Sequence, residues 1–292
     1  MNPQSESNYR GTGCGKAARP DLKGSGEATN RSTWKTTSKA VLTILILVLA
    51  VSMRAQYSGA SVGYAKITRG MNSEFLELEK VAKKLHQARV EKGIITQWHL
   101  YRKMYRGADD PYDYIFVSFY DDYMKTQNSF PAEIREKVMT EEEWAAFIEK
   151  ARKVRTIIKN EYYDQVMAVE EGKPVKYIRI NRYRVKPGEV GTYIDLRREI
   201  TKPIQEELIK RDLMTGWSMW RKITYDREYQ FVTVDAFSEF GQWKSDVSYP
   251  EVLKEVHPNL NQEETMQKLT ESRMLVNSEY WRLVEFTDPA EE

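Results

Sequence analysis

The chain has 292 residues, of which 30% are charged, 41% hydrophobic and 12% aromatic, with a formal net charge of +2 and one cysteine. This composition excludes collagen-like, coiled-coil, disulfide-scaffold and wholly disordered proteins. The length is sufficient for one large domain or two small ones, each able to bury a core.

The N-terminal segment has the pattern of a targeting sequence. Residues 1–39 are rich in Ser, Thr, Gly and Asn, and an apolar run of twelve residues follows from Ala40 to Val51. As a helix this run spans about 18 Å, which is short of the roughly 30 Å hydrocarbon core of a membrane. Lysines precede the run and small residues follow it, which predicts a secretory signal peptide cleaved after Ser52 or after Ala55. A retained membrane anchor is the alternative.

Cleavage would change the charge and the cysteine content of the protein. Met1–Ala55 contains Cys14 with eight basic and three acidic residues, so the mature chain keeps 37 basic and 40 acidic residues, a net charge of −3. Without thiols, an exported protein depends on core packing rather than on disulfides. We therefore expect a secreted or periplasmic protein without a stable membrane anchor. Nucleic acid is an unsuitable partner because no basic patch stands out.

The mature sequence repeats itself at an offset of 119 residues. Leu213–Lys222 (LMTGWSMWRK) echoes Ile94–Lys103 (IITQWHLYRK), and Ser248–Pro250 aligns with Ser129–Pro131 at the same offset. Several anchors at a nearly constant offset predict a tandem duplication. The chain is thus divided into an N-terminal extension with signal peptide at 1–55, a first half at 56–170 and a second half at 171–292.

Each half is predicted to contain a strand, a helix, two strands, a second helix and a last strand. In the first half these elements are expected at 62–67, 73–91, 94–105, 113–120, 141–159 and 162–169. In the second half they are expected at 177–185, 190–210, 213–224, 229–236, 262–276 and 280–286, and Pro203 should kink or break the first helix. The β-α-β-β-α-β order predicts an α+β fold of two tandem ferredoxin-like halves, packed sheet to sheet so that their open faces bury each other.

The stretch Tyr177–Lys244 contains a strand, a Lys-Pro-Gly turn, a helix, a Trp-containing strand and a further strand ending in aromatic residues. This order resembles the dimeric α/β-barrel superfamily, which includes antibiotic-biosynthesis-monooxygenase, NIPSNAP-like and stress-responsive barrel domains. Val62–Lys125 shows the same resemblance more weakly. The resemblance implies a single-chain α/β barrel, but it implies no particular chemistry, because the superfamily contains enzymes, haem proteins and modules without known activity.

Period-2 alternation divides the residues of each strand between a helix-covered face and a face between the sheets. The residues expected under the helices are Ile178, Ile180, Val232, Val234, Trp98, Leu100, Trp217 and Met219. The opposite face is aromatic with a few hydrogen-bonding groups, which is typical of a small-molecule pocket and equally of an inert sheet–sheet interface. It supplies the ligand-binding candidates Tyr101, Tyr114, Phe116, Arg179, Asn181, Tyr183, Trp220, Phe231 and Asp235.

Three residues have more than one interpretation. His99, the only histidine on a predicted strand, is the catalytic candidate; a satisfied buried histidine is the alternative. Arg179 and Asp235 lie on neighbouring strands, where they could clamp a carboxylate or form a cross-strand ion pair.

The other two histidines are expected outside any active site. His86 is expected to be solvated. The resemblance suggests haem on a histidine of the second half, as in two-half barrel proteins of the chlorite-dismutase kind, and His257 is the only histidine placed for this, with a surface loop as the alternative.

Two functions follow from these observations. The first is a non-catalytic exported module, a monomer or a homo-oligomer, that binds a small apolar or aromatic ligand or another protein. The second is a cofactor-independent monooxygenase or isomerase-like enzyme that uses His99 with Tyr101, Trp220 or Asn181, and haem binding is a third option. No metal site or cofactor is expected, because three scattered histidines and no mature cysteine do not form a ligand set.

Overall fold

The computed structural model describes residues 58–169, 174–224, 228–242 and 248–288. The predicted signal peptide, with Ala40–Val51, both cleavage sites and Cys14, lies outside these residues. The described residues belong to the compact unit that begins at Met53. Within them, no helix has the length and apolar character needed to cross a membrane.

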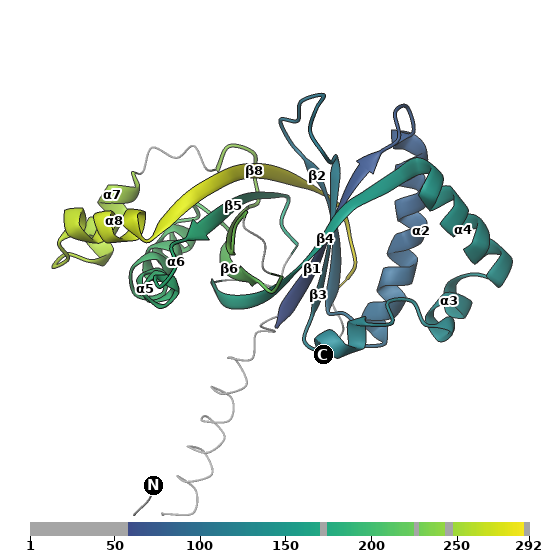
Figure 1. Ribbon diagram of the computed structural model, residues 1–292, viewed down its shortest axis with the longest axis horizontal. Coiled ribbons are helices and arrows are strands. Elements are labelled where there is room, and N and C mark those ends of the chain that lie inside the picture. The colour runs from purple at the N-terminus through teal and green to yellow at the C-terminus, as the bar shows by residue number, and fades with distance from the viewer. Residues whose placement is uncertain (1–57, 170–173, 225–227, 243–247, 289–292) are drawn as a thin grey trace, which may run out of the picture. The chain divides into compact units, whose positions relative to one another are not determined.

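The strands of this unit are all antiparallel to their neighbours and close into a barrel (Figure 1). The strand order around the barrel is β1-β3-β2-β8-β5-β7-β6-β4. Each half contributes four adjacent strands, in the order β4-β1-β3-β2 and β8-β5-β7-β6, so the two halves share one topology. The strands are β1 (Gly59–Ile67), β2 (Gln97–Lys103), β3 (Tyr114–Tyr120), β4 (Arg155–Val169), β5 (Tyr177–Val185), β6 (Gly216–Lys222), β7 (Phe231–Phe237) and β8 (Arg273–Phe286).

The helices cover the outside of the barrel, those of the first half on one side and those of the second half on the other (Figure 1). This arrangement confirms the predicted α+β class with ferredoxin-like topology. The helices are α2 (Asn72–Glu91), α3 (Ala132–Val138), α4 (Glu141–Val154), α5 (Val190–Leu196), α6 (Lys202–Lys210), α7 (Tyr249–Val256) and α8 (Gln262–Glu271).

The two halves are joined edge to edge. Strand β2 pairs with β8, and β4 pairs with β6, so the outer strands of each set find a partner in the other set. The expected packing of two open faces therefore takes the form of one closed barrel, whose interior is shared by both halves. Closure also leaves no unpaired edge at either seam.

Two strands begin inside segments that the sequence pattern predicted to be helical. Strand β4 starts at Arg155, inside the helix expected at 141–159, and β8 starts at Arg273, inside the helix expected at 262–276. The early part of β4 carries the β-branched residues Ile157 and Ile158, which favour a strand. Long-range pairing with β1 and β5 extends both strands, and a single-sequence pattern does not show such pairing.

The expected effect of Pro203 is confirmed. The helix predicted at 190–210 is divided into α5, a π-helical turn at Arg197–Thr201, and α6, with Pro203 in the first turn of α6. Proline lacks an N–H group, so one carbonyl of the preceding turn loses its helical partner and the turn widens there. Arg197 and Thr201, at the two ends of this turn, are both buried.

The face assignment was correct for the second strand of each half and wrong for the first and third strands of the second half. Trp98, Leu100, Trp217 and Met219 lie on the helix side, as predicted. Ile178, Ile180, Val232 and Val234, expected under the helices, line the barrel interior instead. The reason is closure: the interior of a small barrel is filled by side chains from every strand and is shielded from solvent, so the aliphatic sets turn inward.

Candidate functional site

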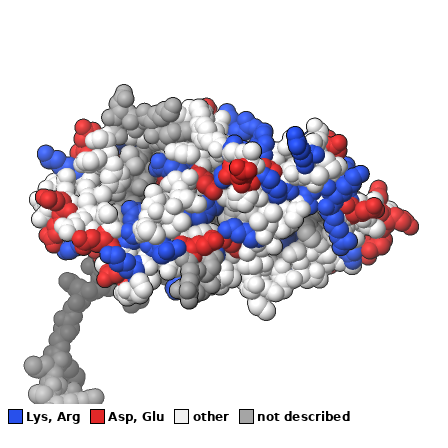
Figure 2. Space-filling view, turned by 45° about the horizontal axis from the view of Figure 1, so that its top comes forward, with Lys and Arg blue, Asp and Glu red and all other residues white. Residues whose placement is uncertain are grey.

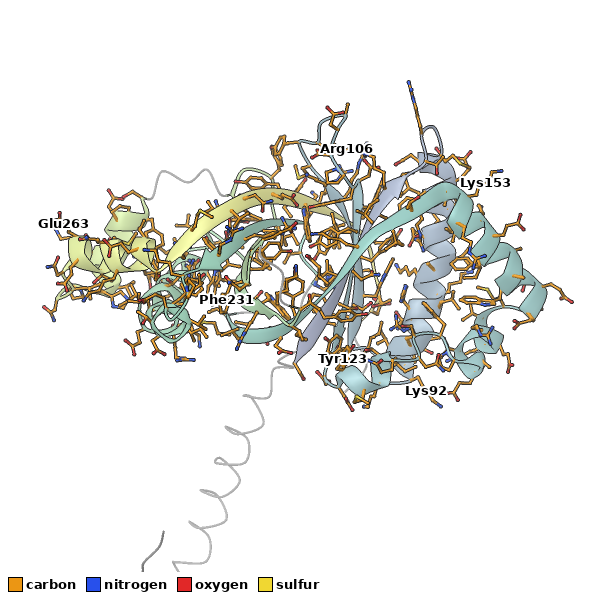
Figure 3. The ribbon with its side chains drawn as sticks, in the orientation of Figure 1. Lys92, Arg106, Tyr123, Lys153, Phe231 and Glu263 are labelled. Carbon is orange, nitrogen blue, oxygen red and sulfur yellow. The ribbon has the colours of Figure 1, made fainter. Side chains whose placement is uncertain are left out.

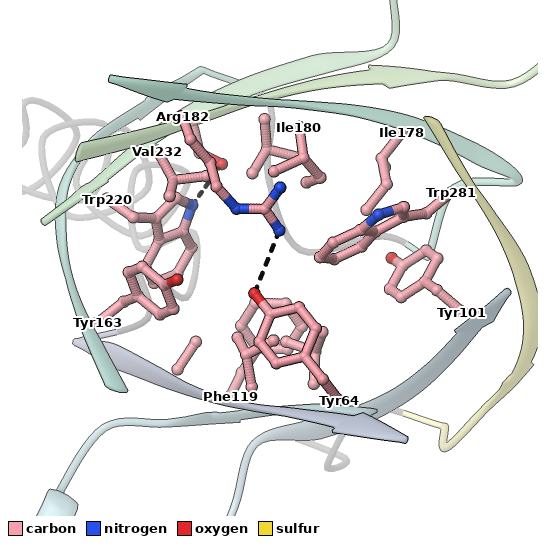
Figure 4. A pocket seen from close by; sticks show the side chains of 15 residues that line it. Tyr64, Tyr101, Phe119, Tyr163, Ile178, Ile180, Arg182, Trp220, Val232 and Trp281 are labelled. Carbon is pink, nitrogen blue, oxygen red and sulfur yellow. Dashed lines mark hydrogen bonds between the residues drawn. The ribbon is translucent and has the colours of Figure 1, made fainter. Parts of the chain in front are cut away.

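The barrel interior contains a small cavity of about 80 Å³ (Figure 4). Side chains from all eight strands line it, among them Tyr64, Phe119, Arg182, Trp220 and Trp281. An engineered apolar cavity that binds one benzene molecule has a volume of about 150 Å³. The interior is therefore a packed core with a residual void. Of the predicted ligand-binding residues, it holds Tyr101 and Trp220.

His99 is packed near this cavity rather than exposed in it. Its side chain is 4% exposed, and its Nδ1 lies 3.0 Å from the hydroxyl of Tyr101, while Nε2 has no hydrogen-bond partner. Burial lowers the pKa of His99 to about 3, so the ring is neutral near pH 7. A general base is most effective when its pKa is close to the working pH. This geometry does not favour catalysis by His99, whose role stays a prediction.

A larger cavity, of about 460 Å³, lies between the strands of the second half and the π-helical turn with helices α6–α8. We call it the sheet–helix cleft. Its floor is formed by β5 and β7, and its roof by the π-helical turn and α6. The volume falls within the roughly 300–1,000 Å³ of small-molecule sites. Its polar lining residues include Arg179, Asn181, Thr233 and Asp235 on the floor and Arg197, Thr201 and Gln205 on the roof.

The cleft exists in the second half because short polar side chains replace an aromatic ring. In the first half, Phe116 pairs with Gly63 across β3 and β1 and packs edge to face on Phe75 of α2, at 6.3 Å between ring centroids. In the second half the corresponding pair across β7 and β5 is Thr233 with Asn181. Without a large ring at this position, the space between sheet and helices stays open.

The floor of the cleft is a hydrogen-bonded network. Arg179 Nε donates to Asp235 Oδ2 at 2.7 Å, and Asn181 Nδ2 donates to the same oxygen at 2.9 Å. Ser278 Oγ in turn donates to Asn181 Oδ1 at 2.6 Å. The cross-strand ion pair between Arg179 and Asp235 is thus confirmed, and it neutralises the carboxylate of the floor.

The roof presents a buried cation. Arg197 is 5% exposed; its Nε donates to the hydroxyl of Tyr193 at 3.1 Å and its Nη1 to Thr201 Oγ1 at 3.4 Å. At the cleft edge, the guanidinium of Arg273 lies 4.2 Å from the centroid of the Tyr183 ring. Both arginines line the cleft.

The predicted ligand-binding residues lie in three places: the barrel interior, the helix side of the second-half strands, and the space beneath α2 in the first half. Arg179, Asn181, Tyr183 and Asp235 line the sheet–helix cleft, on the helix side of the sheet rather than in the barrel. Phe231 also lies on the helix side, with its ring 5.1 Å from that of Tyr193 (Figure 3). Their placement between the sheets was therefore wrong, for the reason given above for the aliphatic residues.

Tyr114 and Phe116 of the first half were also misplaced. Both pack beneath α2 against Phe75. In this half the aromatic rings fill the helix side, so they form core rather than a site.

Sequence reasoning missed Arg197, Thr201, Gln205 and Arg273. The first three are spaced four residues apart in the segment that contains Pro203, so they share one face of the helix. That face is otherwise apolar, and three polar residues on it were the available signal. Arg273 gave no such signal, since it lies in a segment that was expected to be helical.

The remaining histidines, His86 and His257, lie outside the sheet–helix cleft. His257 Nε2 lies 3.2 Å from the carbonyl oxygen of Ile200, and His257 does not line the cleft. The described residues that line the cleft include no histidine or cysteine, so the ligation suggested for His257 does not fit this cavity. In the described parts of the chain, no cluster of metal-ligating side chains occurs. His86, expected to be solvated, is instead partly buried and stacks on Trp98 at 4.6 Å.

The surface charge is mixed on the face that Figure 2 shows. Lys and Arg side chains alternate there with Asp and Glu side chains. This face therefore carries no field of a single sign, and the concentration of positive charge in the cleft is a local feature.

Comparison with known proteins shows similarity at the level of the fold. No family model and no curated protein matches the chain. A putative monooxygenase from Fusobacterium nucleatum superposes with a TM-score of 0.53 at 9% identity, covering 80% of this chain and 96% of that chain. An anthrone oxidase-like protein (TM-score 0.49, 11% identity, 82% and 95% coverage) is similar too. A chlorite dismutase from Candidatus Nitrospira defluvii (0.46, 9%, 80% and 95%) is also similar.

The Fusobacterium nucleatum structure shares the fold of this chain, so the resemblance seen in the sequence is confirmed at the level of the fold. At such low identity this likeness carries no information about activity.

Proposed function

We propose that this protein binds a small organic molecule in the sheet–helix cleft. The observation that carries the proposal is the size of the cleft, about 460 Å³ against about 80 Å³ for the cavity in the barrel. The cleft also combines apolar walls, including Trp217 and Leu269, with convergent polar groups from floor and roof. This combination is characteristic of ligand sites, where apolar walls provide affinity and a few polar groups provide orientation.

A cofactor-independent monooxygenase is the second candidate. The Fusobacterium nucleatum protein that shares the fold is described as a putative monooxygenase. For an enzyme of this kind, the cleft would hold the substrate, because the void beside His99 is too small. The support is an analogy of fold, and the ligand-binding proposal does not depend on it.

A Thr233→Phe variant tests the site. It places on β7 the ring that Phe116 supplies at the corresponding position of the first half, so we expect it to fold and to fill the cleft. Binding of the neutral dye N-phenyl-1-naphthylamine, followed by its fluorescence, should fall at least tenfold. The control Thr233→Val adds no volume and should retain binding. Equal dye affinity in the Phe variant and the wild type would exclude the cleft as the binding site.

We also propose that the protein is exported. The support is the order of lysines, apolar run and small residues before Gln56 in the sequence. Mass spectrometry of the chain secreted by its own cells should give a first residue of Met53 or Gln56. A chain that keeps Met1 in the cell fraction would contradict export.

We infer that the two halves arose by tandem duplication, because equivalent residues make equivalent contacts at the two seams. Lys222 and Tyr229 both donate to Glu161, each at 2.6 Å. At the other seam, Lys103 lies 3.3 Å from Glu279, and Tyr112 donates to it at 2.5 Å. The corresponding residues of these two clusters are 117 to 119 positions apart, as in the sequence repeat.

A further inference from the structure

We propose that the ligand of the sheet–helix cleft is an organic anion, an apolar body bearing one acidic group such as a carboxylate, and that Arg197 and Arg273 bind this group. The inference rests on the proposed function, to which it adds the chemical class of the ligand.

The first support is hydrogen-bonding capacity that the protein leaves unused. Arg197 is only 5% exposed, yet its Nη2 has no hydrogen-bond partner. Arg273 likewise has a buried Nη1 without a partner. A buried donor without an acceptor is costly, and more so when it carries charge. Two such donors on residues lining one cleft indicate that the acceptor comes from outside the chain.

The second support is the charge balance of the cleft. Its described lining contains three arginines and one carboxylate, that of Asp235. Arg179 forms an ion pair with this carboxylate, and Asn181 donates to the same oxygen. Among the described residues no acidic side chain pairs with Arg197 or Arg273. Two positive charges in a partly enclosed cavity therefore lack a counter-charge, and an anionic ligand would supply it.

The third support is that one ring holds both arginines in place. The guanidinium of Arg197 lies 5.0 Å and that of Arg273 4.2 Å from the centroid of the Tyr183 ring. Such cation–π contacts attract each guanidinium to the face of the ring. Arg197 also belongs to the π-helical turn, an irregularity that is frequent at functional sites. The two donors are thus positioned by the fold rather than left on mobile surface side chains.

The apolar walls of the cleft indicate that the rest of the ligand is apolar. Leu208, Trp217, Met266 and Leu269 line the cleft beside these arginines. An inorganic anion would leave this apolar surface in contact with water, whereas an apolar body would cover it. The site is therefore matched to an amphipathic anion.

The experiment compares two dyes that share one body. 1-Anilinonaphthalene-8-sulfonate carries an anionic group, and N-phenyl-1-naphthylamine is its neutral counterpart. Both are titrated into the mature chain and into Arg197→Gln and Arg273→Gln variants. Arg198→Gln is the matched control, since Arg198 is exposed, pairs with Asp195 and loses the same charge one residue away.

We expect each cleft variant to bind the anionic dye at least tenfold more weakly, with less than a twofold change for the neutral dye. Arg198→Gln should change neither. Unchanged affinity for the anionic dye in both cleft variants would overturn the inference, as would an equal loss of both dyes. The proposed function has its own test. If Thr233→Phe left the binding of both dyes unchanged, the cleft would not be the binding site.

Discussion

Replacing Glu161 with Gln is expected to lower the free energy of unfolding by about 3–5 kcal/mol at neutral pH. The carboxylate is 3% exposed and accepts hydrogen bonds from Lys222 at 2.6 Å, Tyr229 at 2.6 Å and Tyr163 at 2.7 Å. The Gln side chain would remove the negative charge that pairs with the ammonium of Lys222, which is itself only 2% exposed. Urea unfolding followed by tryptophan fluorescence measures the effect.

The loss should depend on pH in a defined direction. Burial raises the pKa of Glu161, but hydrogen bonds from Lys222, Tyr229 and Tyr163, with the charge of Lys159, outweigh it and lower the pKa to about 2 from 4.5. A carboxylate with a depressed pKa stabilises the folded state above its unfolded pKa, and this contribution is lost as the pH falls. The difference between wild type and variant should therefore shrink by about 3 kcal/mol between pH about 4.5 and 2.

An exposed carboxylate provides the control. Glu77 pairs with Lys80 at 2.6 Å, but their side chains are 63% and 60% exposed. Glu77→Gln should change stability by less than about 0.5 kcal/mol at any of these pH values. A similarly small effect of Glu161→Gln would mean that the seam does not depend on its buried ion pair.

Replacing Trp220 with Ala is expected to destabilise the protein by about 3–5 kcal/mol and to create a binding site in the barrel. Trp220 is 4% exposed, and its Nε1 donates to Ser218 Oγ at 2.8 Å. It lines the cavity of about 80 Å³, so its removal adds the volume of an indole ring. Indole should then rebind, with a gain of about 2.7 kcal/mol at 100 times its Kd.

This rescue is best measured in the Thr233→Phe background, where the cleft is filled. Thermal unfolding with and without indole should show stabilisation for Trp220→Ala and none for the parent with Trp220. Trp144→Ala on α4 removes a half-buried ring that stacks on Phe147, so it should cost less and gain nothing from indole. Stabilisation of the parent by indole would show that the wild-type barrel already admits a ligand.

The sequence predicts which residues of a strand share a face, but it does not predict whether that face turns toward the barrel interior or toward the helices. The alternation in β5 and β7 divided Ile178 and Val232 correctly from Arg179 and Asp235, but alternation alone does not say which set turns inward. The answer depends on barrel closure, which gives the interior to the aliphatic set. The same four candidates, Arg179, Asn181, Tyr183 and Asp235, were therefore found as a group and assigned to the opposite side of the sheet.

The sequence by itself determined the α+β class, the order of the elements and the break at Pro203, because these follow from local chemistry and from spacing along the chain. The tertiary structure alone decided the closure of the barrel, the extension of β4 and β8, and the contact of both Arg197 and Arg273 with the Tyr183 ring. Each of these depends on contacts between segments far apart in the sequence, and a periodic pattern contains no information on which distant residues will pair.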